Sequence, residues 1–295
     1  QVAYVPPLHK LVYENFDVLF KVRGEANTRG LTGVDPKLQA ARREAILPLT
    51  QLQLQRGATG KLRWVVCLFP TQAYAMEADM SLREYEDFVY SACHVNGSDD
   101  PVAHWKKVQS EQQRLVDYLR GRDQVQVKSK NCDLTLSIKG RTFVNAAGIH
   151  NMPDGEIYTG PVEDSVNGWV RFTYPGVYQG REVDGIEFGF DNGRIVRASG
   201  RKNEEFLVRT LDTDPGARYL GEFAIGTNFG VTRYTKSILF DEKIGGTIHM
   251  AAGAGYPETG SKNQSAVHWD LVCDMRGGEI TVDGKLFYKN GEFKI

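Results

Sequence analysis

The sharpest chemical signal in the sequence is a histidine and a carboxylate two residues apart, His268 and Asp270, in a strand-like apolar stretch. Alternate side chains of a β-strand share a face. Both polar side chains would therefore point one way, while Val267, Trp269 and Leu271 point into a core. Neutral imidazole and carboxylate both bind zinc and similar ions. The pair predicts metal ligation, and a single His–Asp hydrogen bond at a sheet edge is the alternative.

Three further segments carry polar side chains of the same types. His249 lies in a strand-like stretch that small residues follow at 251–255, and a core histidine bonded to a backbone carbonyl is its alternative. Glu222 opens an apolar strand bounded by glycines, and Glu156 follows a Pro-Asp-Gly turn; for each, a solvated surface residue is the alternative. Together these residues form a nitrogen and oxygen ligand set without thiolates, which is typical of hydrolytic metal sites. The set exceeds what one catalytic ion needs, and this favours two ions that share a carboxylate.

The elements that must position these residues change character near residue 120. Before that point the pattern predicts a buried strand at 64–69 and helices from Asp35-Pro36 to Pro48, from a capping box at 81–84, and from Asp100-Pro101 to Gly121. After it the apolar period becomes 2, with strands predicted at 134–138, 142–145, 169–174, 186–190 and 194–198. Hairpin turns are predicted at Asp191-Asn192-Gly193, Asp283-Gly284 and Asn290-Gly291. We therefore predict a mixed α+β fold, with an α/β domain over 1–120 and a β-rich metal-binding catalytic domain over 121–295.

The composition narrows the class of protein. The 295 residues carry a formal net charge of -1 with no basic stripe, which argues against a nucleic-acid partner. The longest apolar run, 64–69, is far too short to cross a bilayer, and the first ten residues lack the pattern of a secretory signal. The cysteines at 67, 93, 132 and 273 are scattered and are expected to be reduced thiols. We expect a cytoplasmic protein with a small or peptidic substrate and no membrane partner.

Long segments of the chain resemble the thermophilic metallo-aminopeptidase family, often called the aminopeptidase T family. The resemblance is carried by NMPDGEIYTGPVEDSVNGWVRFTYP, GEFAIGTN, HMAAGAGYPETG and SAVHWD, and in the amino-terminal half by PTQAYAMEADMSLREYEDFVYSACHVN. It runs from about Asn27 to the end of the chain and is far more specific than a two-residue pattern. The resemblance implies a cytoplasmic dinuclear exopeptidase of broad specificity, acting on peptides as a homodimer with an enclosed cavity.

The metal ligands of that family fall on residues of matching type in this sequence. Carried over one at a time, they are Glu156, Glu222, His249, Tyr256, His268 and Asp270. The resemblance thus implies two divalent ions per chain, and zinc, cobalt and manganese all accept such ligands. One departure is that family members carry a longer amino-terminal domain. We therefore expect a shortened α/β domain here, which bears on how the cavity closes.

Several roles and two other functions stay open. His150 is a candidate for a contact that supports the metal ligands. The general base, or the group that binds the substrate's amine, is sought among polar residues near the ligands, namely Glu163, Asp164 and Glu258, with Lys262 and Asn263 unassigned. The predicted activity is metal-assisted removal of the amino-terminal residue from peptides. The alternatives are a non-catalytic module that binds metal or peptide, and a metal hydrolase of another small amide or ester.

Overall fold

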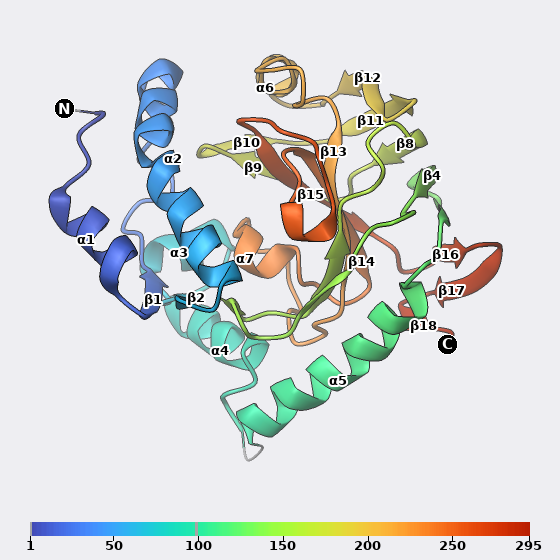
Figure 1. Cartoon of the computed structure of the whole chain (residues 1–295), viewed down its shortest axis with the longest axis horizontal. Coiled ribbons are helices and arrows are strands. Elements are labelled where there is room, and N and C mark those ends of the chain that lie inside the picture. The colour runs from blue at the N-terminus through green and yellow to red at the C-terminus, as the bar shows by residue number, and fades with distance from the viewer. Residues whose placement is uncertain (1, 98–99) are drawn as a thin grey trace.

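The computed structural model describes residues 2–97 and 100–295 (Figure 1). Its amino-terminal part is built on a parallel three-stranded sheet of order β1-β2-β6, from Val18–Arg23, Arg63–Leu68 and Asn151–Met152. The helices of this part are α1 (Pro7–Asn15), α2 (Pro36–Ala58), α3 (Gln72–Glu77), α4 (Leu82–Ala92) and α5 (Pro101–Leu119). Parallel strands joined through α2 give this part the α/β character that the sequence predicts.

Local signals set the starts of α2, α4 and α5 where the sequence predicts them. The Asp35 side chain accepts a hydrogen bond from the amide of Lys37, and Asp100 accepts one from Val102. Ser81 and Glu84 form the predicted capping box at the start of α4. Each cap satisfies backbone donors that the first turn leaves without a partner inside the helix.

The prediction that Pro48 ends its helix is wrong, because α2 continues to Ala58. A proline inside a helix removes one backbone hydrogen bond and costs about 3 kcal/mol. The second half of α2 makes contacts that offset this cost. Leu49 and Gln53 are buried. The Arg56 guanidinium donates hydrogen bonds to the carbonyl oxygen of Tyr13, in the last turn of α1, and to that of Phe16, which follows α1.

The carboxyl-terminal part contains two large antiparallel sheets. One has the order β12-β11-β8-β4-β3-β16-β17-β18, from Arg194–Ser199, Glu187–Asp191, Asn167–Arg171, Cys132–Ser137, Gln124–Ser129, Glu279–Val282, Lys285–Lys289 and Glu292–Phe293. The other has the order β15-β14-β13-β7-β5, from His268–Asp274, Thr247–Gly253, Leu220–Gly226, Glu156–Thr159 and Val144–Ala146. The remaining elements are the hairpin β9 (Gly176–Tyr178) and β10 (Arg181–Val183), the helices α6 (Glu204–Leu211) and α7 (Ile238–Asp241), and the 3-10 turn η1 (Pro257–Thr259).

The three predicted hairpin turns are confirmed. Asn192, Asp283 and Asn290 all have positive φ, as do the glycines that follow them. Two successive positive φ angles match the right-handed twist of the flanking strands. The strands themselves are shifted slightly from the predicted ranges, with β5 at 144–146 and β8 at 167–171.

Two apolar cores hold these layers together. The larger core contains buried side chains from both large sheets, among them Leu134 and Phe188 on one sheet and Trp269 and Met250 on the other. The smaller core joins α3 and α4 to residues 231–244, which lie far along the chain. The division into domains at residue 120 stays a proposal, since β6 and this second core bring later residues into the amino-terminal part. No helix among residues 2–97 and 100–295 has the length and apolarity to cross a membrane.

Candidate metal centre

Strand register places the predicted ligands on one face of the five-stranded sheet. Asp270 on β15 and Glu222 on β13 both pair with Ala251 of β14, which lies between them. In the next row, His249 of β14 pairs with Ala224 of β13. Side chains in alternate positions share a face, so the two alanines leave room among the polar side chains. The opposite face carries the apolar residues of the large core.

Both histidines are oriented by backbone carbonyls. Nδ1 of His249 lies 3.0 Å from the carbonyl oxygen of Glu242, and Nδ1 of His268 lies 2.7 Å from that of Ala254. When Nδ1 donates to a carbonyl, Nε2 is left free to bind a cation, and this is the usual arrangement of histidines in metal sites. In both residues Nε2 points at carboxylates.

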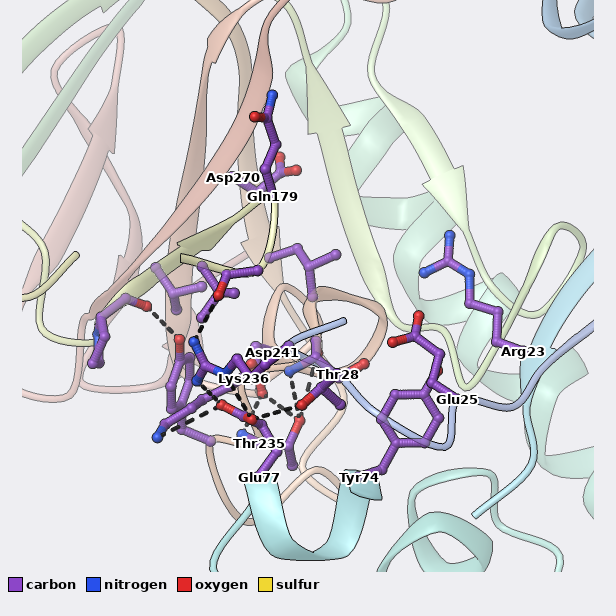
Figure 2. Close-up of a pocket in the computed structure, with 18 residues that line it drawn as sticks. Arg23, Glu25, Thr28, Tyr74, Glu77, Gln179, Thr235, Lys236, Asp241 and Asp270 are labelled. Atoms are coloured by element: carbon purple, nitrogen blue, oxygen red, sulfur yellow. Dashed lines mark hydrogen bonds and ion pairs between the residues drawn. The ribbon is translucent and has the colours of Figure 1, made fainter. Parts of the chain in front are cut away.

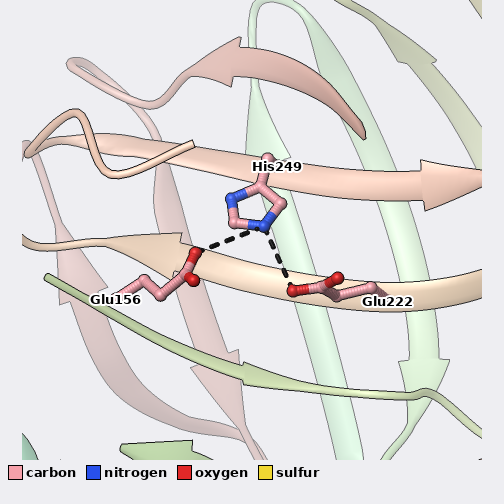
Figure 3. A group of neighbouring side chains, drawn as sticks. All are labelled: Glu156, Glu222 and His249. Carbon is pink, nitrogen blue, oxygen red and sulfur yellow. Dashed lines mark hydrogen bonds and ion pairs between the residues drawn. The ribbon is translucent and has the colours of Figure 1, made fainter. Parts of the chain in front are cut away.

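Glu222 lies between the two histidines. Its Oε1 is 3.2 Å from Nε2 of His249, and its Oε2 is 3.4 Å from Nε2 of His268. Nε2 of His249 is also 3.4 Å from Oε2 of Glu156. Figure 3 shows that the ring of His249 is directed at both glutamates. Nε2 of His268 is also 3.4 Å from Oδ1 of Asp270. A carboxylate whose two oxygens face different histidines has the geometry of a bridge between two cations.

The ligand atoms form overlapping groups of three, in each of which all three atoms lie within 4.8 Å of one another. The groups are Glu156, Glu222 and His249; Glu222, His268 and Asp270; and Glu242, His249 and Asp270. The structure therefore brings together five of the six predicted ligands. The sixth, Tyr256, is at the edge of the cluster, with its hydroxyl 3.4 Å from Nε2 of His268.

Two buried carboxylate oxygens in this cluster make no hydrogen bond, Oε2 of Glu156 and Oδ1 of Asp270. A buried charged oxygen without a partner is costly, and a cation in the site would remove that cost. The donor set of imidazole nitrogens and carboxylate oxygens is also the one that divalent transition ions prefer. The residues present thus fit a metal centre.

Two residues of the cluster have no counterpart in the sequence-based prediction, Glu242 and Lys243. Lys243 is fully buried, its Nζ lies 2.7 Å from Oε1 of Glu156, and it also binds the carboxylate of Glu242. Both residues lie on the segment between α7 and β14, where no periodicity marks them. The only signal in the sequence is a charged Asp-Glu-Lys triplet between apolar segments, a few residues before His249.

Burial and mutual contacts shift the pKa values of the cluster in opposite directions. Burial raises the pKa of Glu156 to about 8, against the opposing charges of Lys243 and His249. Burial also acts to raise the pKa of Glu222, but hydrogen bonds from His249 and His268 lower it to about 2. Burial would lower the pKa of His249, yet the hydrogen bond to Glu222 and nearby carboxylates raise it to about 9. Burial would also lower the pKa of His268, but the nearby carboxylates, Asp270 above all, hold that pKa well above its usual range.

These pKa values predict that the apparent affinity for a divalent ion increases with pH. At pH 7 the metal-free protein holds protons on Glu156 and His249, whose pKa values are raised, and an ion must displace them. Since binding releases protons, mass action strengthens it as pH rises and weakens it as pH falls. We expect about a tenfold or larger gain in zinc affinity between pH 6.5 and 7.5, measured by chelator competition. An affinity that stays constant from pH 6.5 to 8.5 would contradict these protonation states.

The other residues singled out in the sequence lie around the cluster in different roles. The His150 ring stacks on Trp64, with ring centroids 4.3 Å apart. Glu163 forms an ion pair with Arg141 and accepts the backbone amide of Lys262. The Asn263 side chain donates to two backbone carbonyls, those of Gly216 and Gly253. Asp164 and Glu258 are exposed, and of the three acidic candidates only Glu258 lines a cavity that reaches the cluster.

Two cavities open onto the cluster. One, of about 400 Å³, is lined by Glu156, Glu222, Glu242 and Tyr256 on the side of the ligands. The other, of about 320 Å³, reaches only Asp270 and is lined mainly by charged and polar side chains, as Figure 2 shows. At its base Glu77 binds Thr28, Arg29 and Lys236, an ion-pair network that joins the amino-terminal part to the carboxyl-terminal part. The cluster therefore borders two differently lined cavities.

Comparison with known proteins gives a family and a fold. The family described as thermophilic metalloprotease (M29) matches residues 1–293. Aminopeptidase 2 of Geobacillus stearothermophilus is 30% identical over 260 residues, which cover 75% of this chain and 62% of the relative. Aminopeptidase AmpS of Bacillus subtilis (strain 168) is 28% identical over 303 residues, which cover 89% of this chain and 73% of the relative. The chain thus spans less than two thirds of the length of the first of these relatives.

Among solved structures, AmpT from Thermus thermophilus has the same fold. The two superimpose with a TM-score of 0.86 at 23% sequence identity, over 100% of this chain and 81% of that one. At this level of identity the likeness establishes the mixed α and β architecture, and the chemistry must be argued from the cluster itself.

Proposed function

The chain belongs to the thermophilic metalloprotease family M29, and on that premise we propose that it is a metal-dependent aminopeptidase with a two-ion site. The observation that best supports the two-ion site is the position of Glu222, whose two oxygens face His249 and His268 separately. Relatives that align with most of this chain bear the name aminopeptidase. Peptides as substrates, a homodimer and a cytoplasmic location are part of the same proposal.

Two groups of side chains would hold the ions. Glu156, Glu222 and His249 would bind one, and Glu222, His268 and Asp270 the other, with Tyr256 beside His268. Each group offers three protein ligands, which leaves positions open for water and substrate, as a catalytic site requires. Zinc, cobalt and manganese all suit this donor set.

The chemistry that divalent ions supply in such a site is polarisation of a water and of the scissile carbonyl. The chain's own residues keep the ligands in place. The carbonyl oxygens of Glu242 and Ala254 orient the two imidazoles, and Lys243 takes one oxygen of Glu156. The other oxygen of Glu156, which has no hydrogen-bond partner, then faces the proposed ion position. Most of the cluster is buried, which strengthens every electrostatic interaction in it.

A free α-amine should be essential for turnover if the protein is an aminopeptidase. Besides the proposed ligands, Asp154 and Glu258 line the cavity next to the cluster, and their carboxylates suit an ammonium group. We expect metal-loaded protein to hydrolyse leucine anilide, and to hydrolyse N-acetyl-leucine anilide at a rate at least about a hundredfold lower. Blocking the amine removes its charge, so a charged interaction in a desolvated site is lost. The measurement is release of the aniline from each substrate, with leucine methyl ester as a third.

The three substrates separate the possible functions. Equal rates on the free and the blocked anilide, or turnover of the ester alone, would replace the aminopeptidase with another metal hydrolase. Binding of metal and peptide without turnover of any substrate would replace it with a binding module.

A further inference from the structure

Part of the lining of the cavity of about 400 Å³ is apolar, and we call this part the apolar wall. The wall is formed by Trp64 of β2, Val144 of β5 and Ile149, and Gly57 of α2, which is close to the indole, also lines the cavity. This wall comes partly from the amino-terminal part of the chain and faces a cluster that is built entirely by the carboxyl-terminal part. A cavity with one apolar wall and a few convergent polar groups is typical of a site for a small ligand.

The indole of Trp64 is held in place by His150 and by helix α2. The His150 ring stacks on it at an interplanar angle of 13°, and Nδ1 of His150 lies 3.2 Å from the carbonyl oxygen of Trp64. A Cβ added to Gly57 would lie 3.2 Å from Nε1 of the indole, so α2 also packs closely against the ring. A rigid aromatic surface of this kind can select ligands by shape.

Ile149 adds an exposed apolar surface at the same cavity. Its side chain is 55% exposed, although the cluster nearby is strongly polar. An exposed aliphatic side chain beside a polar site gains if a ligand covers it.

The acidic lining decides which part of a peptide would enter here. Glu156, Glu222 and Glu242 border this cavity, and so does Asp154, which is buried and has an Oδ1 without a hydrogen-bond partner. Carboxylates favour the positively charged α-amine. The second cavity touches the cluster only at Asp270, and its four carboxylates are offset by three cations, Arg23, Arg29 and Lys236. Among the described residues that line the first cavity there is no lysine or arginine. The first residue of a peptide, with its free amine, therefore fits the cavity that Trp64 lines.

From this arrangement we infer that Trp64, with Ile149 and Val144, forms the binding surface for the side chain of the first residue and gives the enzyme a preference for large apolar residues there. The inference rests on the proposed aminopeptidase function. One methylene group in an apolar pocket changes specificity by roughly 10- to 200-fold. We therefore expect kcat/KM for leucine anilide to exceed that for alanine anilide by at least about tenfold.

The test compares leucine, phenylalanine and alanine anilides in metal-loaded wild type, Trp64→Ala and Ile149→Ser. We expect Trp64→Ala to lower the leucine-to-alanine ratio of kcat/KM by about tenfold. Ile149→Ser, at an exposed site where folding is at little risk, should lower the ratio by about threefold. Val196→Ser, at an equally exposed aliphatic residue on β12, is the matched control and should leave the ratio unchanged.

An unchanged ratio in both Trp64→Ala and Ile149→Ser would overturn the assignment of this wall. If the wild-type protein hydrolyses no anilide, the proposed aminopeptidase function is wrong. The binding preference of the pocket is then tested by binding alone. Titration calorimetry with leucine and alanine hydroxamates measures the same preference without turnover. Equal affinities for the two hydroxamates would overturn the pocket, and a leucine preference that is lost in Ile149→Ser would support it.

Discussion

Replacing Glu222 by Gln should lower kcat/KM for leucine anilide by at least about a thousandfold and reduce the number of bound ions per chain. The two oxygens of Glu222 face two histidines, and the hydrogen bonds from those histidines keep the carboxylate ionised, with its pKa lowered to about 2. An amide of the same shape carries no charge and offers one weak ligand oxygen, so neither proposed ion position would stay complete. Activity and metal content of the purified variant test this.

The matched control is Glu205→Gln, because Glu205 is 87% exposed on α6 and pairs only with Arg209 of the same helix. This variant should keep wild-type activity and metal content. If Glu222→Gln kept two ions and activity within tenfold of wild type, Glu222 would not be the shared ligand. Near-ultraviolet circular dichroism shows whether the variant has kept its fold.

Replacing Lys243 by Met should destabilise the metal-free protein far more than the metal-loaded protein. Lys243 is fully buried between Glu156 and Glu242, and removing one partner of a buried ion pair costs about 3–5 kcal/mol. For a chain of this size we expect Tm to fall by roughly 6–10 °C in the presence of chelator. When ions are bound, their charge compensates the same carboxylates, so the loss in Tm should shrink to less than half.

The measurement is differential scanning calorimetry with chelator and with zinc, at about pH 8.5, above the pKa of about 8 of Glu156, so that its carboxylate is ionised. Lys202→Met, which breaks an ion pair at an exposed lysine, is the control and should shift Tm by less than about 2 °C. A loss of Tm in Lys243→Met that is equal with and without zinc would show that the lysine has only a structural role. An unchanged Tm both with chelator and with zinc would show that the charge of Lys243 does not stabilise the buried carboxylates of Glu156 and Glu242.

The parts of the fold that follow from neighbouring residues could be predicted. The capping box at Ser81 and the turn at Asn192 are set by interactions within four residues, and both are confirmed. The alternation around His268 gave the correct faces, with Trp269 and Leu271 fully buried. Pro48 shows the limit of such local rules, because contacts made later in α2 outweigh its local cost.

The metal cluster could not be built from local signals. Glu156 and Asp270 are separated by more than a hundred residues, and only the register of β13, β14 and β15 brings Glu222 next to Asp270. Residue types and strand patterns singled out Glu156, Glu222, His249, His268 and Asp270 only as candidates, each with a bland alternative. Resemblance to a family then assigned them as ligands and added Tyr256. Glu242 and Lys243 escaped it because they lie outside regular strands, and because a lysine is almost never fully buried unless it is paired.

The measurement that tests the central claim most directly is hydrolysis of leucine anilide by chelator-treated protein, before and after zinc, cobalt or manganese is added, with bound ions counted per chain. We predict no turnover without metal and full turnover once about two ions are bound, since Glu222 offers one oxygen to each proposed position. Full activity in chelator, or no activity with any of these ions in protein shown to be folded and loaded, would contradict a metal-dependent aminopeptidase.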